Sequence, residues 1–281
     1  MTTSHELMVV TGASTGLGAA TTRALAARGY HVLAGVRREA DAVQADGISP
    51  VILDITRPSD IASLASRVSA SGLPLRALIN NAGISVNAPV ETLPLDEWRR
   101  LFEVNLFGHV AVTQALLPFL HRSGGRIVNI SSVGGKVAMA TYGPYAGTKF
   151  ALEAVSDALR RELAPHGVEV VVVEPGAVRT EMGARGAATA TGLASKMSAE
   201  HQRRYGGLVE AVVAHSLRFT GAGMPAEKAA RTVARAATTR RPRTRYAIGR
   251  DAGLLTRLVR VLPDRVLDRV TAATLRPYFP Q

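Results

Sequence analysis

The 281-residue sequence contains no cysteine, and only four of its 34 basic residues are lysine. Without cysteine the chain can form neither disulfides nor thiolate metal sites, and it has no cysteine nucleophile. Its seven histidines include no closely spaced pair of the kind that binds zinc from one helix, so we expect no metal site. The absence of cysteine also agrees with the reducing cytoplasm, which is the location that we expect.

Long hydrophobic runs are missing as well. The polar N-terminus precedes an apolar stretch of only residues 7–10, which is too short for a signal peptide. No window approaches the roughly 20 apolar residues that cross a bilayer. The sequence therefore predicts a protein without a transmembrane segment.

Acidic residues are outnumbered by basic ones, which gives a formal net charge of +12. Such an excess can attract nucleic acid, an anionic membrane surface or phosphate-bearing ligands, but arginine enrichment also follows from a GC-rich genome. The charges are scattered, and no nucleic-acid recognition motif accompanies them. We therefore expect no nucleic-acid partner.

What the sequence does contain is an alternation of short β-branched runs with longer amphipathic segments, which is typical of repeated βα units. The expected strands are residues 7–11, 31–36, 51–54, 77–80, 126–131, 169–174 and 245–248. The expected helices are residues 17–28, 61–71, 95–121 and 145–164. The pattern predicts an α/β protein in which residues 1–281 form a single-domain Rossmann fold with a doubly wound, seven-stranded parallel sheet.

Two segments depart from this alternation. Residues 181–224 are rich in Gly, Ala, Thr and Ser, and we predict that they form an insertion over the sheet edge that acts as a substrate lid. Residues 251–281 form a C-terminal helical extension with an amphipathic pattern that is interrupted at Pro263. Its apolar face could pack on the core, on another subunit or on a membrane surface, and the first two are the more common outcomes.

The first expected strand leads directly into a glycine-rich turn, residues 11–18 (TGASTGLG), that opens the first helix. Glycines let backbone amides approach a pyrophosphate, and the helix N-terminus adds unpaired N–H groups and a partial positive charge. This context predicts a dinucleotide site at Gly12, Ser14, Thr15, Gly16, Leu17 and Gly18.

Residues 12–16 of the same turn also match the G-x-S-x-G nucleophile elbow of serine hydrolases, with Ser14 as the nucleophile. In those enzymes the elbow follows several strands, whereas here it follows the first. A hydrolase is therefore the disfavoured alternative, together with a protein that senses the cofactor without turnover.

The second expected strand ends at Val36, followed by Arg37 and Arg38. An acidic residue at this end would accept hydrogen bonds from the ribose 2′-hydroxyl of NAD, whereas Arg37 attracts a 2′-phosphate. The sequence thus favours NADP (NADPH) over NAD. The alternative is that both arginines are simply solvated.

Tyr145 and Lys149 are four residues apart, one turn along the same helix face, directly after a strand that ends near Ser132. Open α/β sheets bind ligands at this carboxyl edge. A phenol has a pKa of about 10, and a neighbouring cation stabilises its anion; reaching pH 7 takes about 4 kcal/mol, which Lys149 and a nicotinamide ring could share. We predict that Tyr145 exchanges a proton with the substrate oxygen and that Ser132 holds that oxygen.

These motifs, with Asp54, the segments 80–83 (NNAG) and 175–180 (PGAVRT), and Asn105, resemble those of the short-chain dehydrogenase/reductase family from Thr11 to about Thr180. The resemblance implies that Asn105 belongs to the catalytic group, as the anchor of a water relay to Lys149. It also implies further cofactor-binding residues, namely Asp54, Ile55, Asn81, Ala82, Gly83, Lys149, Pro175, Gly176, Val178 and Thr180.

Within that set, the resemblance assigns Asp54 to the adenine amine, and Val178 with Thr180 to the nicotinamide carboxamide. Plainer roles are possible, because Asn105 can kink its helix and Asp54 can cap the next turn. For Asn80 we expect a structural role between adjacent strands.

The predicted function is NADP(H)-dependent hydride transfer to or from a carbonyl or secondary alcohol. Residues 133–142 and the lid, with their Ala, Met and Gly content, suggest a small or apolar substrate. The motif set is similar to that of members that act on hydroxysteroid- or retinol-like substrates. The family also pairs helices like 95–121 and 145–164 between subunits, which implies a homodimer or homotetramer.

Overall fold

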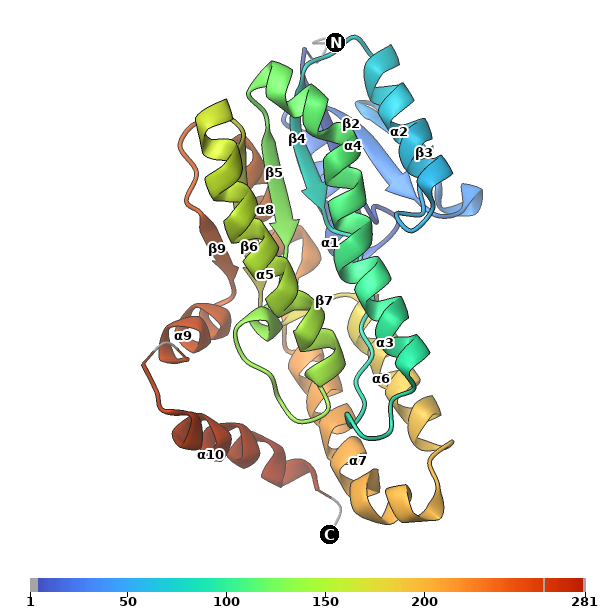
Figure 1. The fold of residues 1–281 in the computed structure, drawn as a ribbon, viewed down its shortest axis with the longest axis vertical. Coiled ribbons are helices and arrows are strands. Elements are labelled where there is room, and N and C mark those ends of the chain that lie inside the picture. Colours follow the sequence, from blue (N-terminus) through green and yellow to red (C-terminus); the bar gives the residue numbers. More distant parts are fainter. Residues whose placement is uncertain (1–4, 260, 280–281) are drawn as a thin grey trace.

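Seven parallel strands form the central sheet of this computed structural model, which describes residues 5–259 and 261–279 (Figure 1). The sheet has the order β3-β2-β1-β4-β5-β6-β9. The strands are β1 (Leu7–Val10), β2 (His31–Val36), β3 (Ile48–Ile52), β4 (Leu75–Asn80), β5 (Arg126–Ile130), β6 (Glu169–Pro175) and β9 (Arg245–Ile248). The predicted single-domain Rossmann fold with a seven-stranded parallel sheet is confirmed, and the strand order reverses between β1 and β4, where open sheets of this kind bind ligands.

The inner strands are apolar along their whole length because helices cover both faces of the sheet. All four residues of β1 and all five of β5 are buried. The edge strand β3 differs, since it begins at Ile48 and not at residue 51 as predicted, and it includes Pro50. An edge strand tolerates proline because one of its sides needs no backbone donor.

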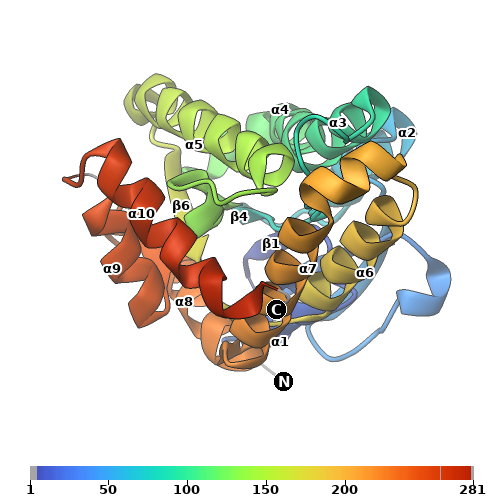
Figure 2. The ribbon, with the colours of Figure 1, turned by 90° about the horizontal axis from the view of Figure 1, so that it is seen from below.

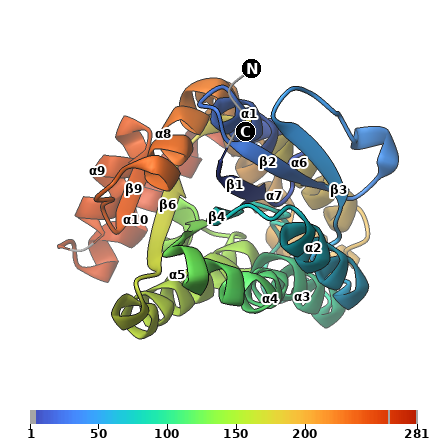
Figure 3. The same ribbon diagram turned by 90° about the horizontal axis from the view of Figure 1, so that it is seen from above.

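Helices lie on the two faces of the sheet (Figure 3). One face carries α1 (Gly16–Ala26) and α8 (Ala226–Thr238), which contribute Leu25 and Val233 to the first core cluster. The other face carries α2 (Pro58–Ala70), α4 (Gly108–Ser123) and α5 (Gly143–Leu163), and its core includes Leu64 and Leu116.

The predicted helix over residues 95–121 is helical throughout and continues to Ser123, but it is not one regular α-helix. The chain forms α3 (Leu95–Phe102), then a π-helical turn over Glu103–Phe107, and only then α4. Asn105 lies in this turn, fully buried, with its side chain bonded to other segments of the chain. Single π turns occur mostly at functional sites, where they redirect a side chain.

The predicted lid segment forms two helices, α6 (Glu181–Ala194) and α7 (Ala199–Gly221), beyond the carboxyl ends of the strands (Figure 1). Its two ends are joined by a small parallel pair that the sequence did not reveal, β7 (Val178–Arg179) with β8 (Met224–Pro225). Both ends of the lid therefore leave the rest of the domain at the same place, where β7 pairs with β8.

The C-terminal extension forms α9 (Arg250–Leu258) and α10 (Asp264–Leu275), and Pro263 caps α10 where the break was predicted. Positions 260 and 280–281 of the predicted extension lie outside the described residues. The chain then forms a short 3-10 turn, Arg276–Tyr278, which returns to the lid, with the Tyr278 ring 5.3 Å from that of His215 on α7 (Figure 2). No helix in the part of the chain that the structure describes is long and apolar enough to span a bilayer.

Candidate active site

The glycine-rich turn between β1 and α1 adopts a conformation that requires glycine. Gly12 and Gly16 have φ of +64° and +56°, which L side chains rarely adopt. A Cβ on Gly12 would also lie 2.8 Å from Ala82 Cα. Glycine at these two positions thus lets the turn form a backbone cradle packed against Ala82 and Thr180, of the kind that approaches a pyrophosphate closely.

Asn81 and Thr11 hold this cradle in shape. The Asn81 side chain donates to the carbonyls of Thr11 (2.9 Å) and Gly12 (3.1 Å). The Thr11 hydroxyl accepts from the backbone N–H groups of Asn81 (2.9 Å) and Ala82 (3.0 Å). Sequence reasoning did not assign a role to Thr11, although its place directly before Gly12 was a usable signal.

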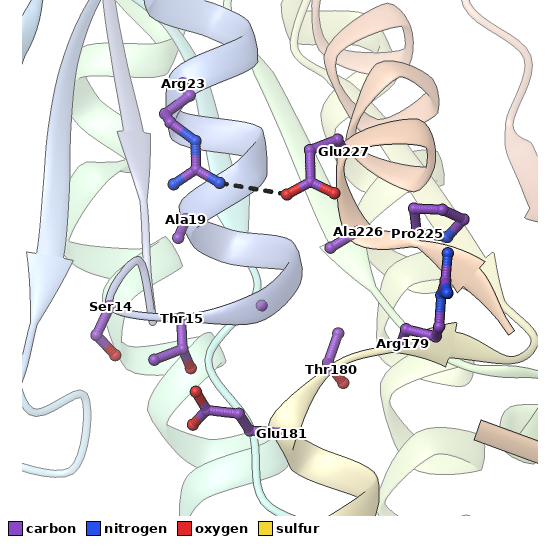
Figure 4. Close-up of a pocket in the computed structure, with 11 residues that line it drawn as sticks. Ser14, Thr15, Ala19, Arg23, Arg179, Thr180, Glu181, Pro225, Ala226 and Glu227 are labelled. Atoms are coloured by element: carbon purple, nitrogen blue, oxygen red, sulfur yellow. Dashed lines mark ion pairs between the residues drawn. The ribbon is translucent and has the colours of Figure 1, made fainter. Parts of the chain in front are cut away.

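A pocket of about 650 Å³ opens at the amino end of α1 (Figure 4). Ser14, Thr15 and Gly16 line it, and Thr180 lies against Gly16, where an added Cβ would be 3.1 Å from the Thr180 side chain. The pocket therefore brings together predicted cofactor-binding residues that are far apart in the sequence, those of the glycine-rich turn and Thr180. Leu17 points elsewhere and packs in the apolar cluster between α1 and α8.

The other lining residues of this pocket give Ser14 no histidine, the base that a serine hydrolase uses. They are Ala19, Arg23, Arg179, Glu181, Pro225, Ala226 and Glu227, and none of these described residues is a histidine. Arg23 and Glu227 form an ion pair at 3.6 Å across its rim (Figure 4). The surroundings suit an anion near a helix N-terminus better than a serine nucleophile.

The segment that carries Thr180 follows β6 in a fixed path. Pro175 ends β6, and the N–H of Gly176 donates to the carbonyl of Ile248 on β9 at 2.9 Å. Val178 then begins β7. This path places the predicted nicotinamide-side residues beside the glycine-rich turn.

Two residues predicted to bind the adenosine part of the cofactor, Arg37 and Asp54, differ in whether their side chains already have partners. Arg37 is exposed at the carboxyl end of β2, while Arg38 pairs with Asp41 at 2.8 Å. Asp54 Oδ1 accepts from the Thr56 N–H (3.0 Å) and hydroxyl (2.7 Å), so Asp54 caps the following turn. Burial opposes ionisation of Asp54, but the bonds from Thr56 and the charge of Arg37 hold its pKa below the usual range. Binding of the adenine amine by Asp54 stays a prediction.

Ile55 and Gly83, two of the predicted cofactor-binding residues, lie close to the π turn and its end. Ile55 is buried against Gly108, where an added Cβ would be 2.7 Å from the Ile55 side chain. Gly83 faces Asn105, whose Oδ1 would be 3.3 Å from an added Cβ. These two positions connect the cofactor side to the π turn.

Asn105 joins three segments at that turn. Its side chain accepts from the Ile84 N–H (2.9 Å) and donates to the Ile84 carbonyl (2.9 Å) and the Thr148 hydroxyl (3.1 Å). Thr148 directly precedes Lys149, so Asn105 braces the helix that carries the predicted catalytic lysine. Sequence reasoning did not single out Thr148, and a water relay through Asn105 stays a prediction.

Asn80 has the structural role that we expected. Its side-chain amide donates to Asn129 on the neighbouring strand β5 (2.9 Å) and to Thr113 on α4 (3.0 Å). Asn129 in turn donates to Ser156 on α5 (2.8 Å). This buried chain of bonds links β4, β5 and their covering helices.

Ser132, Tyr145 and Lys149 come together beyond the carboxyl end of β5. The Ser132 hydroxyl accepts from the Gly134 N–H at 3.0 Å, and the Tyr145 ring lies so close that a Cβ on Gly134 would be 3.3 Å from Cε1. Lys149 donates to the carbonyl of Ile130 at 3.0 Å, and its Nζ lies 5.8 Å from the Tyr145 ring centroid.

The protein alone keeps the phenol of Tyr145 protonated. Burial raises the pKa of Tyr145 to about 12, against a hydrogen bond with Ser132 that lowers it. Burial also lowers the pKa of Lys149 to about 8, while Glu153 acts in the opposite direction. The shift of Tyr145 toward neutral pH that Lys149 and a bound nicotinamide ring would share stays a prediction. A protonated phenol is the form that can donate a proton.

The lid contacts the predicted pocket wall at Tyr142, through partners on α7 that the sequence did not reveal. The Tyr142 hydroxyl donates to Ser216 on α7 at 3.3 Å. At the other end of α7, Glu91 pairs with Arg204 at 2.7 Å and accepts from the hydroxyl of Tyr205. These pairs could not be predicted from local sequence patterns, because each joins residues more than 70 positions apart.

Comparison with known proteins gives consistent relatives over nearly the whole chain. A family model described as short chain dehydrogenase matches residues 6–190. Retinol dehydrogenase 5 of Mus musculus is 36% identical over 285 residues, which cover 95% of the chain and 88% of the relative. The NADPH-dependent 3-dehydrocapnine reductase of Ornithobacterium rhinotracheale is 33% identical over 276 residues, 93% of the chain and 94% of the relative. A crystal structure of a short chain dehydrogenase from Burkholderia cenocepacia J2315 in complex with NADP has a TM-score of 0.74 at 27% identity, covering 98% of this chain and 99% of that one.

Proposed function

The chain belongs to the short-chain dehydrogenase family, and from this membership we propose that it is an NADP(H)-dependent oxidoreductase that acts through Ser132, Tyr145 and Lys149. The reaction is hydride transfer between the nicotinamide and a carbonyl or secondary alcohol. The observation that carries the proposal is the packing of Ser132 and Tyr145 around Gly134, with Lys149 one turn further along α5.

The residues have distinct roles in the direction of reduction. When bound, NADPH supplies the hydride that adds to the carbonyl carbon. Tyr145 donates its phenolic proton to the carbonyl oxygen, so that C=O becomes CH–OH, and Ser132 holds that oxygen by a hydrogen bond. The ammonium of Lys149 stabilises the phenolate that remains. Oxidation of an alcohol uses the same groups in reverse.

The residues for the cofactor fit a dinucleotide. The cradle at Gly12 and Gly16 and the amino end of α1 would hold the pyrophosphate. Preference for NADP is supported by the exposed Arg37 at the end of β2, by the NADPH-dependent relative, and by the NADP complex of the structural neighbour. We assign Asp54 and residues 81–83 to the adenosine side, Val178 and Thr180 to the nicotinamide side, and Ile55, Pro175 and Gly176 to the cofactor without a stated side.

Substrate entry is proposed under the lid formed by α6 and α7. The contact of Tyr142 with Ser216 ties this lid to the start of the catalytic helix. A small or apolar substrate agrees with the composition of residues 133–142 and with a relative named for retinol. A cytoplasmic location is part of the same proposal, supported by the absence of cysteine.

A homodimer or homotetramer is proposed to form through α4 and α5. Phe107 and Phe150, on the π turn and on α5, are 53% and 45% exposed. The π turn packs on α5, so both aromatic rings lie on neighbouring elements. Exposed aromatic side chains on adjacent elements are typical of a surface that a second subunit covers.

The direct test is oxidation of NADPH, followed by its absorbance, with a panel of ketones and aldehydes that includes retinal, a ketosteroid and small ketones. Wild-type protein should consume NADPH with at least one of them, and Tyr145→Phe should not. A sensor would bind NADPH without Tyr145-dependent oxidation. A hydrolase would react with a fluorophosphonate, and Ser14→Ala would abolish that labelling.

A further inference from the structure

A buried group of charges lies one turn beyond Lys149. Glu153, 5% exposed, pairs with Lys136 at 2.7 Å and with Arg245 of β9 at 3.1 Å. Glu174 on β6, 4% exposed, contacts the same two cations at 3.5 Å and 3.3 Å. Two cations from outside the catalytic helix thus pair with both buried carboxylates, and none of the reaction steps above uses them.

The geometry connects Glu153 to Lys149. The two residues occupy the same face of α5, because four positions make about one helical turn. Both also border Gly135, where an added Cβ would be 3.1 Å from Glu153 Cγ, 3.1 Å from the Lys149 carbonyl and 2.7 Å from Ser131 Oγ. Glu153 therefore lies directly beneath the turn that carries Ser132 and behind the backbone of Lys149.

The two oxygens of Glu153 have different surroundings. Oε2 accepts from both Lys136 and Arg245. Oε1 is buried and has no hydrogen-bond partner within the described residues, and the same holds for the neighbouring Ser131 hydroxyl. The two cations thus fix the carboxylate through Oε2, and its negative charge favours the charged form of Lys149 one turn away.

Lys149 needs such a charge because burial of an ammonium is costly without a counter-ion. The titratable groups that face it are Tyr145 and Glu153 on its own helix and His109 on α4. Burial and the charge of Lys149 lower the pKa of His109 to about 3, so His109 is neutral, and Tyr145 is protonated. Among these three groups, Glu153 is the one that carries negative charge.

Lys136 and Arg245 reduce the effect of the Glu153 charge on Lys149 but do not cancel it. Both cations bind Oε2 of Glu153, and Arg245 also pairs with Asp157 at 3.0 Å. Burial raises the pKa of Glu174, and the charge of Glu153 adds to that shift. Glu153 and Glu174 therefore share the same two counter-ions, Lys136 and Arg245.

We propose that Glu153 is a positioning residue for the hydride-transfer reaction, whose carboxylate keeps the ammonium of Lys149 charged and in place beside Tyr145. This inference rests on the proposed function of the site. It assigns the Lys136–Glu153–Arg245 cluster a role in the chemistry, in addition to joining η3 (Val133–Gly135), α5 and β9.

The test measures the charge of Lys149 directly. The chain has only four lysines, so growth with lysine labelled with ¹³C at Cε gives four resolvable signals, and Lys149→Met identifies the relevant one. The Cε shift is followed against pH in the full chain, with and without NADPH. In wild-type protein the Lys149 signal should titrate with a midpoint at about 8.

Two variants should move this midpoint in opposite directions. Glu153→Gln removes the negative charge at nearly constant shape and should lower the midpoint by about one pH unit. Lys136→Met removes a cation from the same carboxylate and should raise it. A purely structural role for the cluster would not give shifts of opposite sign, and the signals of Lys196 and Lys228 should not move in either variant.

An unchanged Lys149 midpoint in folded Glu153→Gln would overturn the inference. If that variant does not fold, Lys136→Met decides, and a fixed or lowered midpoint there is equally fatal. Failure of the proposed function is a separate result, namely no Tyr145-dependent consumption of NADPH by wild-type protein. If turnover is found, Glu153→Gln should lower kcat about fivefold near pH 8, where the wild-type lysine is half charged and the lysine of the variant is about one-tenth charged.

Discussion

The carbonyl of Gly12 lies directly against the Cα of Gly18, so that a Cβ on Gly18 would come within 2.1 Å of the Gly12 oxygen. The same Cβ would be 2.4 Å from the Asn81 side-chain nitrogen, which holds the turn. The first turn of α1 and the loop before it can therefore approach each other only when residue 18 has no side chain. This contact fixes the path of the backbone that is proposed to bind pyrophosphate.

Gly18→Ala should abolish NADPH binding and lower the free energy of unfolding by about 2 kcal/mol or more, because the backbone of the cradle must move. The matched control is Gly192→Ala in α6, where an added Cβ meets nothing within 4 Å. This control should leave NADPH binding unchanged and raise stability by up to about 1 kcal/mol through helix propensity. Calorimetric titration with NADPH and urea unfolding measure both effects. Full NADPH affinity in Gly18→Ala would contradict the assigned cradle.

Tyr145→Phe should lower kcat about a thousandfold, because it removes the proton donor while the ring that packs on Gly134 is retained. The dissociation constant for NADPH should change little. Tyr142→Phe is the control, since Tyr142 contacts the lid at Ser216 and is not followed by lysine one turn later. Comparable losses of kcat in the two variants would remove Tyr145 from its assigned role.

Arg37→Ala should raise the KM for NADPH about tenfold, because a charge-assisted bond to the 2′-phosphate is lost. The KM for NADH should stay nearly constant. Arg38→Ala provides the comparison, since Arg38 is engaged with Asp41 through two hydrogen bonds. Steady-state kinetics with both cofactors test the prediction, and equal effects of Arg37→Ala on NADPH and NADH would refute it.

His109 makes the fold sensitive to acid. Its pKa is lowered from 6.5 to about 3 in the folded protein, so below pH 6.5 the unfolded chain binds a proton that the folded chain does not. The free energy of unfolding must then fall as the pH drops from about 6.5 toward 3, at up to about 1.4 kcal/mol per pH unit. His109→Gln should remove this part of the dependence.

Urea unfolding between pH 7 and pH 4.5 tests the effect of His109 above the range in which most carboxylates titrate. Wild-type protein should lose about 2 kcal/mol over this range, and His109→Gln should lose clearly less. Parallel curves for the two proteins would mean that His109 is protonated in the folded state or contributes nothing.

Phe150→Asp should convert the proposed oligomer into monomers, because a buried, unpaired carboxylate at an interface is strongly unfavourable. Val43→Asp is the control, since Val43 is also exposed but lies between β2 and β3. Light scattering at micromolar concentration measures the mass of each protein. A monomeric wild-type chain would rule out the proposed assembly.

The parts of the fold that the sequence could predict are those that depend on local physics. Periodicity located six of the seven strands of the sheet within about two residues, and glycine placement identified the turn after β1. The four-residue spacing of Tyr145 and Lys149 was enough to place both on one face of α5. These features need no knowledge of distant contacts, because each follows from backbone geometry over a few residues.

The features that the sequence did not reveal depend on distant contacts. The π turn at Asn105 exists where a buried amide meets Ile84 and Thr148, which come from two other segments. The charges of Glu153 and Arg245 are 92 positions apart in the chain and meet only because β9 pairs with β6. Pattern reasoning treats each of these residues as an ordinary member of its own helix or strand.

The late position of β9 in the chain also sets the order in which the protein is completed on the ribosome. Synthesis is vectorial, and the polypeptide that forms β1 to β5 leaves the ribosome long before Arg245 is translated. The nucleotide half of the domain can therefore assemble early, whereas the Lys136–Glu153 pair gains its third member only when the final strand is added. A nascent chain halted before residue 245 would carry every motif of the reaction and still lack the arginine that completes the charge cluster beside its reactive lysine.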